Sequence, residues 1–375
     1  MRYYIIAGER SGDLHAGNLA KELRKIDPEA NMRGFGGDNM LGAGVEIDVH
    51  YSEMAVMGFW EVVTNLRKIS RYLNRCKDDI LRFKPDVVVL VDYGGFNKRI
   101  AAWATREGLK VYYYISPKVW AWNQGRAWKL KATVNKMFVI LPFEKDFYKK
   151  FDWDVDYVGN PVLDAVKAHI PSVDFRGNHK IRTDRPIVAL LPGSRTQELK
   201  HVLPILSDVV KQFPDYQFAL AAIKDVRSEL YESVKDLPNV SLVMEDTYNL
   251  LQQSAAAVVT SGTATLETAL FGVPQVVVYR TSPISYLIAK SLIRVPYISL
   301  VNLIANKEVV KELIQGEFTA HNIARELRDI FTTDRSQAIR SDYKRIYDLL
   351  DIGSASGNAA SLMYHYLRQS ETSPG

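Results

Sequence analysis

The chain has 375 residues, of which 47% are hydrophobic and 24% charged, so it is long enough for two globular domains with buried cores. Its single cysteine, Cys76, excludes an intramolecular disulfide and fits a reducing compartment. The net charge of +5 is compatible with anionic small molecules or an anionic membrane surface and is weak evidence for nucleic acid binding. No apolar run approaches the ~18 residues of a membrane span, so we expect neither an anchor nor a signal peptide.

The chain begins with a strand, a glycine turn and a helix. The apolar run 2–7 predicts a strand, and residues 8–13 lead into a helix with leucines at helical spacing. Glu9 lies in this turn, where a carboxylate facing helix amides would stay ionised. It either complements the helix dipole or contributes to a site, and its position alone leaves both open.

Residues 54–60 are rich in methionine and aromatic side chains, including Met57 and Trp60, and a long amphipathic helix follows them. Such a stripe usually belongs to a core. The alternative is a surface for acyl chains or a membrane, because methionine and tryptophan suit adaptable apolar and interfacial contacts.

The apolar run 86–91 predicts a strand of a parallel sheet covered on both faces. Asp92 ends this strand, where open α/β sheets bind their ligands. We therefore rank Asp92 first among the candidates for a general base. The alternative is an N-cap of the next helix, which contains Asn97.

Basic and aromatic residues alternate between positions 117 and 136, with Trp120 and Trp122 among them. There are three interpretations: nucleic-acid binding, contact with a membrane or a phosphorylated lipid, and a solvated helix with buried tryptophans.

The Asp152-x-Asp154 spacing could hold a divalent cation, but its alternation suggests an edge strand, so we expect no metal site.

A polar, irregular stretch from 168 to 185 is the best candidate for a linker between domains. We therefore predict domains at 1–168 and 186–350, with a helix at about 352–370 that packs back on the first domain.

The second half opens with a strand at 187–191 and the turn Pro192-Gly193-Ser194-Arg195. We expect Ser194 to cap the following helix, with Gln197 as its capping-box partner. A cation at Arg195 opposes the helix dipole, so either a neighbouring carboxylate or a bound diphosphate should offset it.

A third strand, turn and helix start spans residues 256–267 and contains Ser261, Gly262 and Thr263. Hydroxyls and a glycine let backbone approach phosphate oxygens closely. Glu267, one turn into the helix, either accepts hydrogen bonds from a ribose diol or simply complements the dipole.

Two further polar residues stand out in the second half. Arg280 follows the predicted strand 275–279, and Asn302 is a lone amide in an apolar segment. A buried asparagine needs hydrogen-bond partners, and either a ligand or backbone would serve.

Several short segments between about residue 3 and about residue 315 form a joint pattern. They are Ala7-Gly8-Glu9-x-Ser11-Gly12-Asp13, Ala55-Val56-Met57-Gly58, Ser116-Pro117-x-Val119-Trp120-Ala121-Trp122, Leu141-Pro142-Phe143-Glu144, Leu191-Pro192-Gly193-Ser194-Arg195, Ser261-Gly262-Thr263-Ala264-x-Leu266-Glu267 and Ser299-Leu300-x-Asn302-Leu303. No single segment is decisive, but together and in this order they resemble the lipid-A-disaccharide synthases, which are inverting glycosyltransferases.

The resemblance implies the α/β GT-B fold, with two Rossmann-like domains facing across a cleft. It also implies that a UDP-linked 2,3-diacylglucosamine donor is transferred to the 6-hydroxyl of 2,3-diacylglucosamine 1-phosphate, giving a β-1,6 disaccharide and UDP. The reaction would occur at the cytoplasmic face of the bacterial inner membrane, with peripheral attachment and with no metal, cofactor or nucleic acid.

In this interpretation Asp92 is the base, and Glu9 orients the acceptor or shares the task. The family often has an Asp where this chain has Gly95, so the catalytic role concentrates on Asp92. The remaining residues of the expected site divide between donor and acceptor. The donor residues are Ser194, Arg195, Ser261, Gly262, Thr263, Glu267, Arg280 and Asn302, and the acceptor or lipid residues are Met57, Trp60, Asn97, Trp120 and Trp122.

Two other classes of function remain as alternatives at this point. One is another enzyme of the same fold, such as a UDP-N-acetylglucosamine 2-epimerase or a transferase with a soluble acceptor. The other is a nucleotide-sensing or RNA-binding module, which leaves Asp92, Glu9 and Glu267 unexplained.

Overall fold

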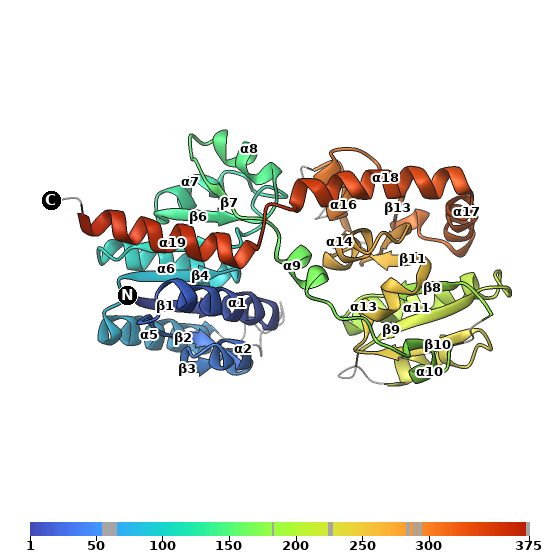
Figure 1. Cartoon of the computed structure of the whole chain (residues 1–375), viewed down its shortest axis with the longest axis horizontal. Coiled ribbons are helices and arrows are strands. Elements are labelled where there is room, and N and C mark those ends of the chain that lie inside the picture. The colour runs from blue at the N-terminus through green and yellow to red at the C-terminus, as the bar shows by residue number, and fades with distance from the viewer. Residues whose placement is uncertain are drawn as a thin grey trace. The chain divides into compact units, whose positions relative to one another are not determined.

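The computed structural model describes residues 1–54, 66–181, 184–223, 228–282, 286–287, 290 and 295–372. The chain forms two compact units, one of residues Met1–Pro161 with Asp351–Gly375 and one of Val162–Leu350 (Figure 1). Met57 and Trp60 lie outside the described residues, so the interpretation of segment 54–60 stays a prediction.

The first unit contains a parallel seven-stranded sheet in the order β3-β2-β1-β4-β5-β6-β7. The order reverses between β1 and β4, which is the arrangement of a Rossmann-like domain. The strands are β1 (Arg2–Ala7), β2 (Asn31–Gly36), β3 (Glu46–His50), β4 (Val87–Val91), β5 (Val111–Tyr114), β6 (Lys136–Val139) and β7 (Asp156–Tyr157). The helices of this unit are α1 (Arg10–Ile26), α2 (Asp38–Gly42), α3 (Tyr51–Met54), α5 (Leu66–Phe83), α6 (Gly94–Arg106), α7 (Arg126–Lys131), α8 (Phe143–Lys149) and α19 (Ala355–Thr372).

The second unit repeats this plan with a parallel six-stranded sheet in the order β10-β9-β8-β11-β12-β13. Its order reverses between β8 and β11. The strands are β8 (Ile187–Leu191), β9 (Gln217–Ala222), β10 (Val240–Met244), β11 (Ser254–Thr260), β12 (Gln275–Tyr279) and β13 (Glu312–Ile314). The helical segments are α9 (Pro161–Lys167), α10 (Phe175–Asn178), α11 (Thr196–Val210), η1 (Ser228–Tyr231), α12 (Glu232–Lys235), α13 (Thr247–Gln252), α14 (Thr263–Leu270), α16 (Leu300–Ala305), η2 (Gln315–Glu317), α17 (Ala320–Ile330) and α18 (Thr333–Leu350).

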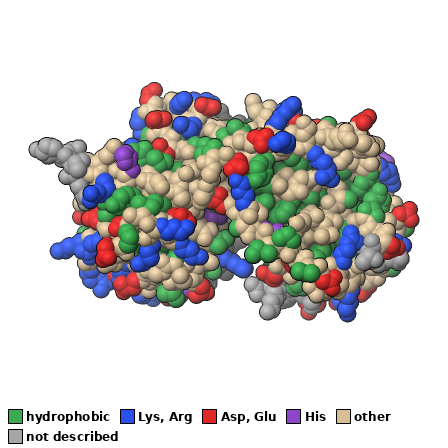
Figure 2. Space-filling model, in the orientation of Figure 1, with side chains coloured by type: hydrophobic (Ala, Val, Ile, Leu, Met, Phe, Trp, Pro, Cys, Tyr) green, Lys and Arg blue, Asp and Glu red, His purple; other side chains and the backbone are tan. Residues whose placement is uncertain are grey.

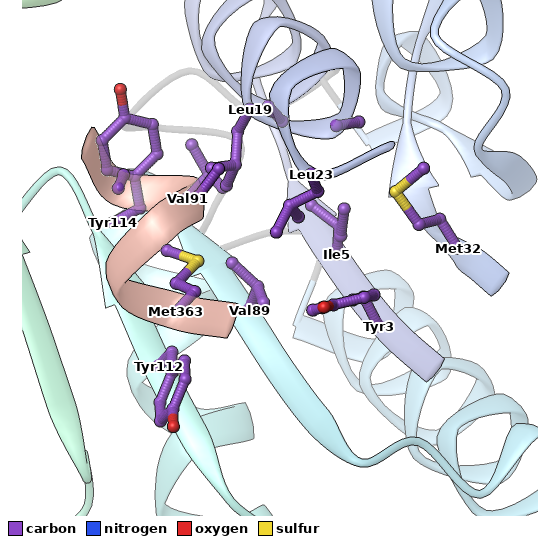
Figure 3. Packing of buried hydrophobic residues seen from close by; sticks show 14 of the residues in the cluster. Tyr3, Ile5, Leu19, Leu23, Met32, Val89, Val91, Tyr112, Tyr114 and Met363 are labelled. Atoms are coloured by element: carbon purple, nitrogen blue, oxygen red, sulfur yellow. The ribbon is translucent and has the colours of Figure 1, made fainter. Parts of the chain in front are cut away.

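The two sheet faces of the first unit are covered by different helices, because successive side chains of a strand point to opposite faces. Ile5 of β1 packs in one cluster with Leu19 of α1 and Met363 of α19 (Figure 3). Tyr4, on the opposite face, lies against Phe83 of α5. The last helix of the chain therefore completes the core of the first unit.

Residues 168–181 pack on the second unit more closely than their polar composition suggests. Phe175 and Ile181 are buried in its core together with Ile187 and Leu191 of β8. The ring of His169 makes edge contacts with aromatic side chains of the same unit. These buried side chains attach the stretch to the second unit, which spans Val162–Leu350.

A buried carboxylate ties α5 to the sheet of the first unit. Asp79 is 2% exposed, and its Oδ2 accepts a hydrogen bond from the Tyr4 hydroxyl at 2.8 Å. The Arg33 guanidinium donates from Nε to Oδ2 at 2.9 Å and from Nη2 to Oδ1 at 3.0 Å. This bidentate pair neutralises Asp79 in an apolar environment.

Candidate active site

The carboxyl ends of β1 and β4 bring Glu9 and Asp92 into neighbouring turns. Ala7 pairs with Val91 in the sheet register, so the two turns start side by side at the point where the strand order reverses. Open α/β sheets bind ligands at this place. Tyr93 links the turns: its ring occupies the space that a Cβ on Gly8 would need, and burial and then the charge of Glu9 raise its pKa.

Asp92 sits on a strained stretch of backbone. Asp92 and Tyr93 both have a φ of 47°, a left-handed conformation that costs non-glycine residues about 1–3 kcal/mol. Hydrogen bonds to the Asp92 carbonyl oxygen hold this conformation, from Asn97 Nδ2 at 2.9 Å and from the Tyr113 hydroxyl at 2.6 Å. The N-cap of α6 is Tyr93, so Asp92 is not the cap that the sequence offered as an alternative.

The environment of Asp92 raises the pKa of its carboxyl group. Burial is the main cause, and the charge of Lys118 and a hydrogen bond from the Tyr93 amide oppose it. A carboxylate with a raised pKa is a stronger base, so the shift favours proton abstraction.

Two of the residues that were expected to contact the acceptor are buried in this structure. Asn97 is fully buried, and its amide nitrogen donates to the Val91 and Asp92 carbonyl oxygens, so it supports the Asp92 turn, and its contact with the acceptor stays a prediction. Trp120 is 5% exposed and packs edge-on against Phe143 with the ring centroids 5.0 Å apart. Trp122, in contrast, is 41% exposed.

Glu144 belongs to the segment 141–144 of the family pattern, and the sequence assigned it no role, but in the structure it is a buried carboxylate. It is 1% exposed, and its Oε2 accepts hydrogen bonds from the amides of Leu141 at 2.9 Å and Ile140 at 3.2 Å. Burial raises its pKa to about 7 despite these bonds. A glutamate near a helix start is ordinary in sequence, so only the tertiary burial distinguishes it.

Changing Glu144 to Gln should alter how stability depends on pH. In the folded protein the Glu144 carboxyl group has a pKa of about 7, compared with an ordinary value of 4.5. In the window between these two pH values, the group stays protonated in the folded protein but ionises in the unfolded chain. The free energy of unfolding of the wild type should therefore fall by on the order of 3 kcal/mol as pH rises through the window, relative to the variant. Urea unfolding of both proteins at about pH 5 and about pH 8 measures this difference, and parallel pH profiles would contradict it.

The turn after β8 differs in its capping from the sequence prediction. Arg195, not Ser194, is the N-cap of α11, and Glu198 takes the role expected of Gln197. Glu198 Oε2 accepts the amides of Ser194 at 3.2 Å and Arg195 at 3.3 Å. Gly193 has a φ of 101°, which favours glycine there.

Both Ser194 and Arg195 are exposed at this turn. The Arg195 guanidinium lies 3.5 Å from Glu198 Oε1, and its side chain is 83% exposed. An exposed pair of this kind contributes little to stability, so the guanidinium remains available to an anion.

The turn after β11 presents Thr263 to solvent but not the donors of Ser261. The Ser261 hydroxyl donates to the Ile298 carbonyl oxygen at 3.0 Å, and its amide donates to Val278 at 2.9 Å. The Ser261 hydroxyl and amide thus support the turn, and the expected contact of Ser261 with a phosphate stays a prediction. Gly262 is the N-cap of α14, and a Cβ there would meet open space.

Glu267 is held by an aromatic neighbour. The Tyr248 hydroxyl donates to Glu267 Oε1 at 3.0 Å. Burial raises the pKa of Glu267, and this hydrogen bond opposes the shift. The bond fixes one carboxylate oxygen and so orients the group.

Asn302 and Arg280 have opposite environments. Arg280 is exposed directly after β12. Asn302 is fully buried: its Nδ2 donates to Val310 O and Glu312 Oε1, both at 2.9 Å, and its Oδ1 accepts the amides of Val309 and Val310. The side-chain amide of Asn302 has its full set of partners inside the protein, and its expected contact with the donor stays a prediction.

Two parallel Rossmann-like sheets in one chain are the architecture of the GT-B fold. The chain resembles a putative UDP-N-acetylglucosamine 2-epimerase from Listeria monocytogenes, with a TM-score of 0.67, 14% identity and coverage of 99% of this chain and 97% of that one. It also resembles the calicheamicin glycosyltransferase CalG4, with a TM-score of 0.67, 15% identity and coverage of 98% of each chain. At these identities the likeness establishes the fold.

Closer relatives identify the family. The family described as LpxB, lipid-A-disaccharide synthetase, matches residues 3–362. The chain is 39% identical to the lipid-A-disaccharide synthase of Syntrophus aciditrophicus (strain SB) and 37% identical to that of Geobacter metallireducens. The alignments cover 98% of this chain in both cases, and 98% and 97% of the two relatives.

The chain belongs to the lipid-A-disaccharide synthase family, and it is a glycosyltransferase of lipid A biosynthesis. Membership implies UDP-diacylglucosamine and diacylglucosamine 1-phosphate as substrates.

Proposed function

We propose that Asp92 is the general base of an inverting glycosyl transfer. It takes the proton of the acceptor 6-hydroxyl while that oxygen forms a bond to the anomeric carbon of the donor. The bond between this carbon and the UDP oxygen breaks, and UDP leaves with the electron pair. The observation that carries the proposal is the Asp92 carboxyl group itself, which follows β4 at the strand-order reversal, is held on strained backbone and has a raised pKa.

Glu9 lies in the neighbouring turn and orients the acceptor in this proposal. Its exposure at the N-cap position of α1 and its electrostatic effect on Tyr93 support a place beside Asp92.

UDP is held by the second unit in this proposal. Its diphosphate needs neutralisation more than protonation, because the leaving group already carries a stable charge. Arg195 and Thr263 are exposed after β8 and β11, and Arg280 is exposed after β12, so three adjacent strands contribute. Ser194 adds an exposed hydroxyl to the same turn as Arg195. Glu267, oriented by Tyr248, accepts the ribose hydroxyls.

Replacing Arg195 by alanine tests the diphosphate role. A lost charge-assisted hydrogen bond should raise the KM for the UDP donor about tenfold to hundredfold, with a smaller effect on the KM for the acceptor. Steady-state kinetics with each substrate varied in turn measure both constants. Lys211→Ala, at the far end of α11, is the matched control. An unchanged donor KM for Arg195→Ala would exclude the role.

We further propose that the protein attaches peripherally to the inner face of the bacterial inner membrane, since both substrates carry acyl chains. None of the helices within the described residues combines the length and apolarity that crossing a bilayer requires. Trp122, 41% exposed beneath the Arg126 guanidinium, supports interfacial contact by the stretch 120–136. Basic and acidic side chains are interspersed on the face shown in Figure 2, so neither positive nor negative charge covers a broad area of that face.

Sedimentation with anionic vesicles at low salt tests the attachment. The wild type should sediment with vesicles, and Trp122→Ser should sediment less. Failure of the wild type to sediment would exclude attachment through this stretch.

A further inference from the structure

Three cationic side chains gather beside the turn that carries Asp92. Lys98 comes from the first turns of α6, Lys118 from the loop after β5, and Arg126 from the start of α7. Gly94 is where α6 and the loop meet: a Cβ built on it would lie 3.2 Å from Pro117 Cβ and 3.9 Å from Lys98 Cε. Elements remote in sequence therefore bring Lys98 and the Lys118 loop to one place.

Electrostatic effects connect the three cations to one another and to Asp92. The pKa of Lys98 is lowered, mainly by burial and also by the charge of Arg126. The charge of Lys118 acts on the Asp92 carboxyl group and lowers its pKa against the effect of burial. The Arg126 guanidinium stacks over the Trp122 ring at 4.3 Å, which fixes its position.

No carboxylate in the described part of the chain forms an ion pair with any of these three cations, whereas Arg33 and Arg75 in the same unit are paired with Asp79 and Asp48. A Cβ built on Gly95 would meet open space. The aspartate that the family often has at this position would place a carboxylate about one helical turn from Lys98, and this chain has no side chain there. Lys98 and Arg126 are half-buried and Lys118 is exposed. Like charges held this close together repel one another, and a bound anion would offset the repulsion.

We propose that Lys98, Lys118 and Arg126 bind the phosphate monoester of the acceptor sugar. The inference rests on the proposed function, because the acceptor 6-hydroxyl must then reach Asp92. The acceptor is the substrate that carries a terminal phosphate, and a guanidinium with two ammonium groups suits such a dianion. The cluster thus sets the direction of the acceptor, with its phosphate at the cluster and its 6-hydroxyl at Asp92.

Kinetics with single variants test this site. Lys98→Met and Arg126→Gln should each raise the KM for diacylglucosamine 1-phosphate in mixed micelles about tenfold, with kcat and the donor KM changed less than about twofold. Arg99→Gln, an exposed cation on the same helix, is the matched control and should leave all three constants unchanged. Glucosamine 1-phosphate should inhibit the wild type more strongly than glucosamine, and this difference should shrink in both variants.

The outcomes separate this site from the general-base proposal and from a membrane role. If the acceptor KM is unchanged in both variants, the phosphate site is overturned. If Asp92→Asn nevertheless loses disaccharide formation, the general-base proposal stands. Loss of sedimentation with anionic vesicles, together with a normal acceptor KM in micelles, would assign the cluster to lipid headgroups and also overturn the proposal. A raised KM in micelles with normal sedimentation would support it.

Discussion

Asp92→Asn should reduce kcat by about 10²–10⁴-fold, because removal of a general base typically has this effect. The amide has nearly the shape of the carboxylate but cannot take the proton of the acceptor 6-hydroxyl. The hydrogen bonds that hold the turn reach the Asp92 backbone oxygen, so the substitution leaves the backbone supported. Disaccharide formation measured by mass, with circular dichroism to establish folding, gives the result.

Asp154→Asn is the matched control for this variant, since Asp154 is an exposed carboxylate of the same unit. It should retain normal turnover. The raised pKa of Asp92 adds a second readout: the base is active only when ionised, so wild-type activity should fall with decreasing pH at a higher pH than for an ordinary aspartate. Near-normal turnover by folded Asp92→Asn would remove Asp92 from the role.

Asp79→Ala should destabilise the first unit by about 1–3 kcal/mol, because the buried Tyr4 hydroxyl loses its acceptor while Arg33 keeps Glu46 and Asp48 as partners. Asp79 is 2% exposed and accepts from both Tyr4 and Arg33. A loss of this size is a large part of the stability of an ordinary domain. Urea unfolding followed by circular dichroism measures it.

Asp78→Ala provides the comparison, since this neighbouring carboxylate is exposed. Surface substitutions of this kind usually change stability by about 0.5 kcal/mol or less. Equal losses in the two variants would show that the buried network around Asp79 is not what stabilises α5.

Local patterns were sufficient to predict the two Rossmann-like sheets and the place of the candidate site in each. The apolar runs 2–7, 86–91 and 187–191 correspond to β1, β4 and β8, and each ends in the predicted turn. Hydrophobic periodicity reports which local segments are buried, and parallel strands share one carboxyl edge. The positions of Glu9 and Asp92 in adjacent turns follow from these two facts.

The sequence by itself thus determined the strand, turn and helix units and the residues that end each strand. Tertiary structure decided which polar side chains face inward, as Asn97 and Asn302 do, and which tryptophan is exposed. It also placed α19 in the core of the first unit, more than 300 positions from β1. The physical reason is that a buried polar group is satisfied by partners distant in sequence, as Asp79 is by Tyr4, and no local pattern encodes that pairing.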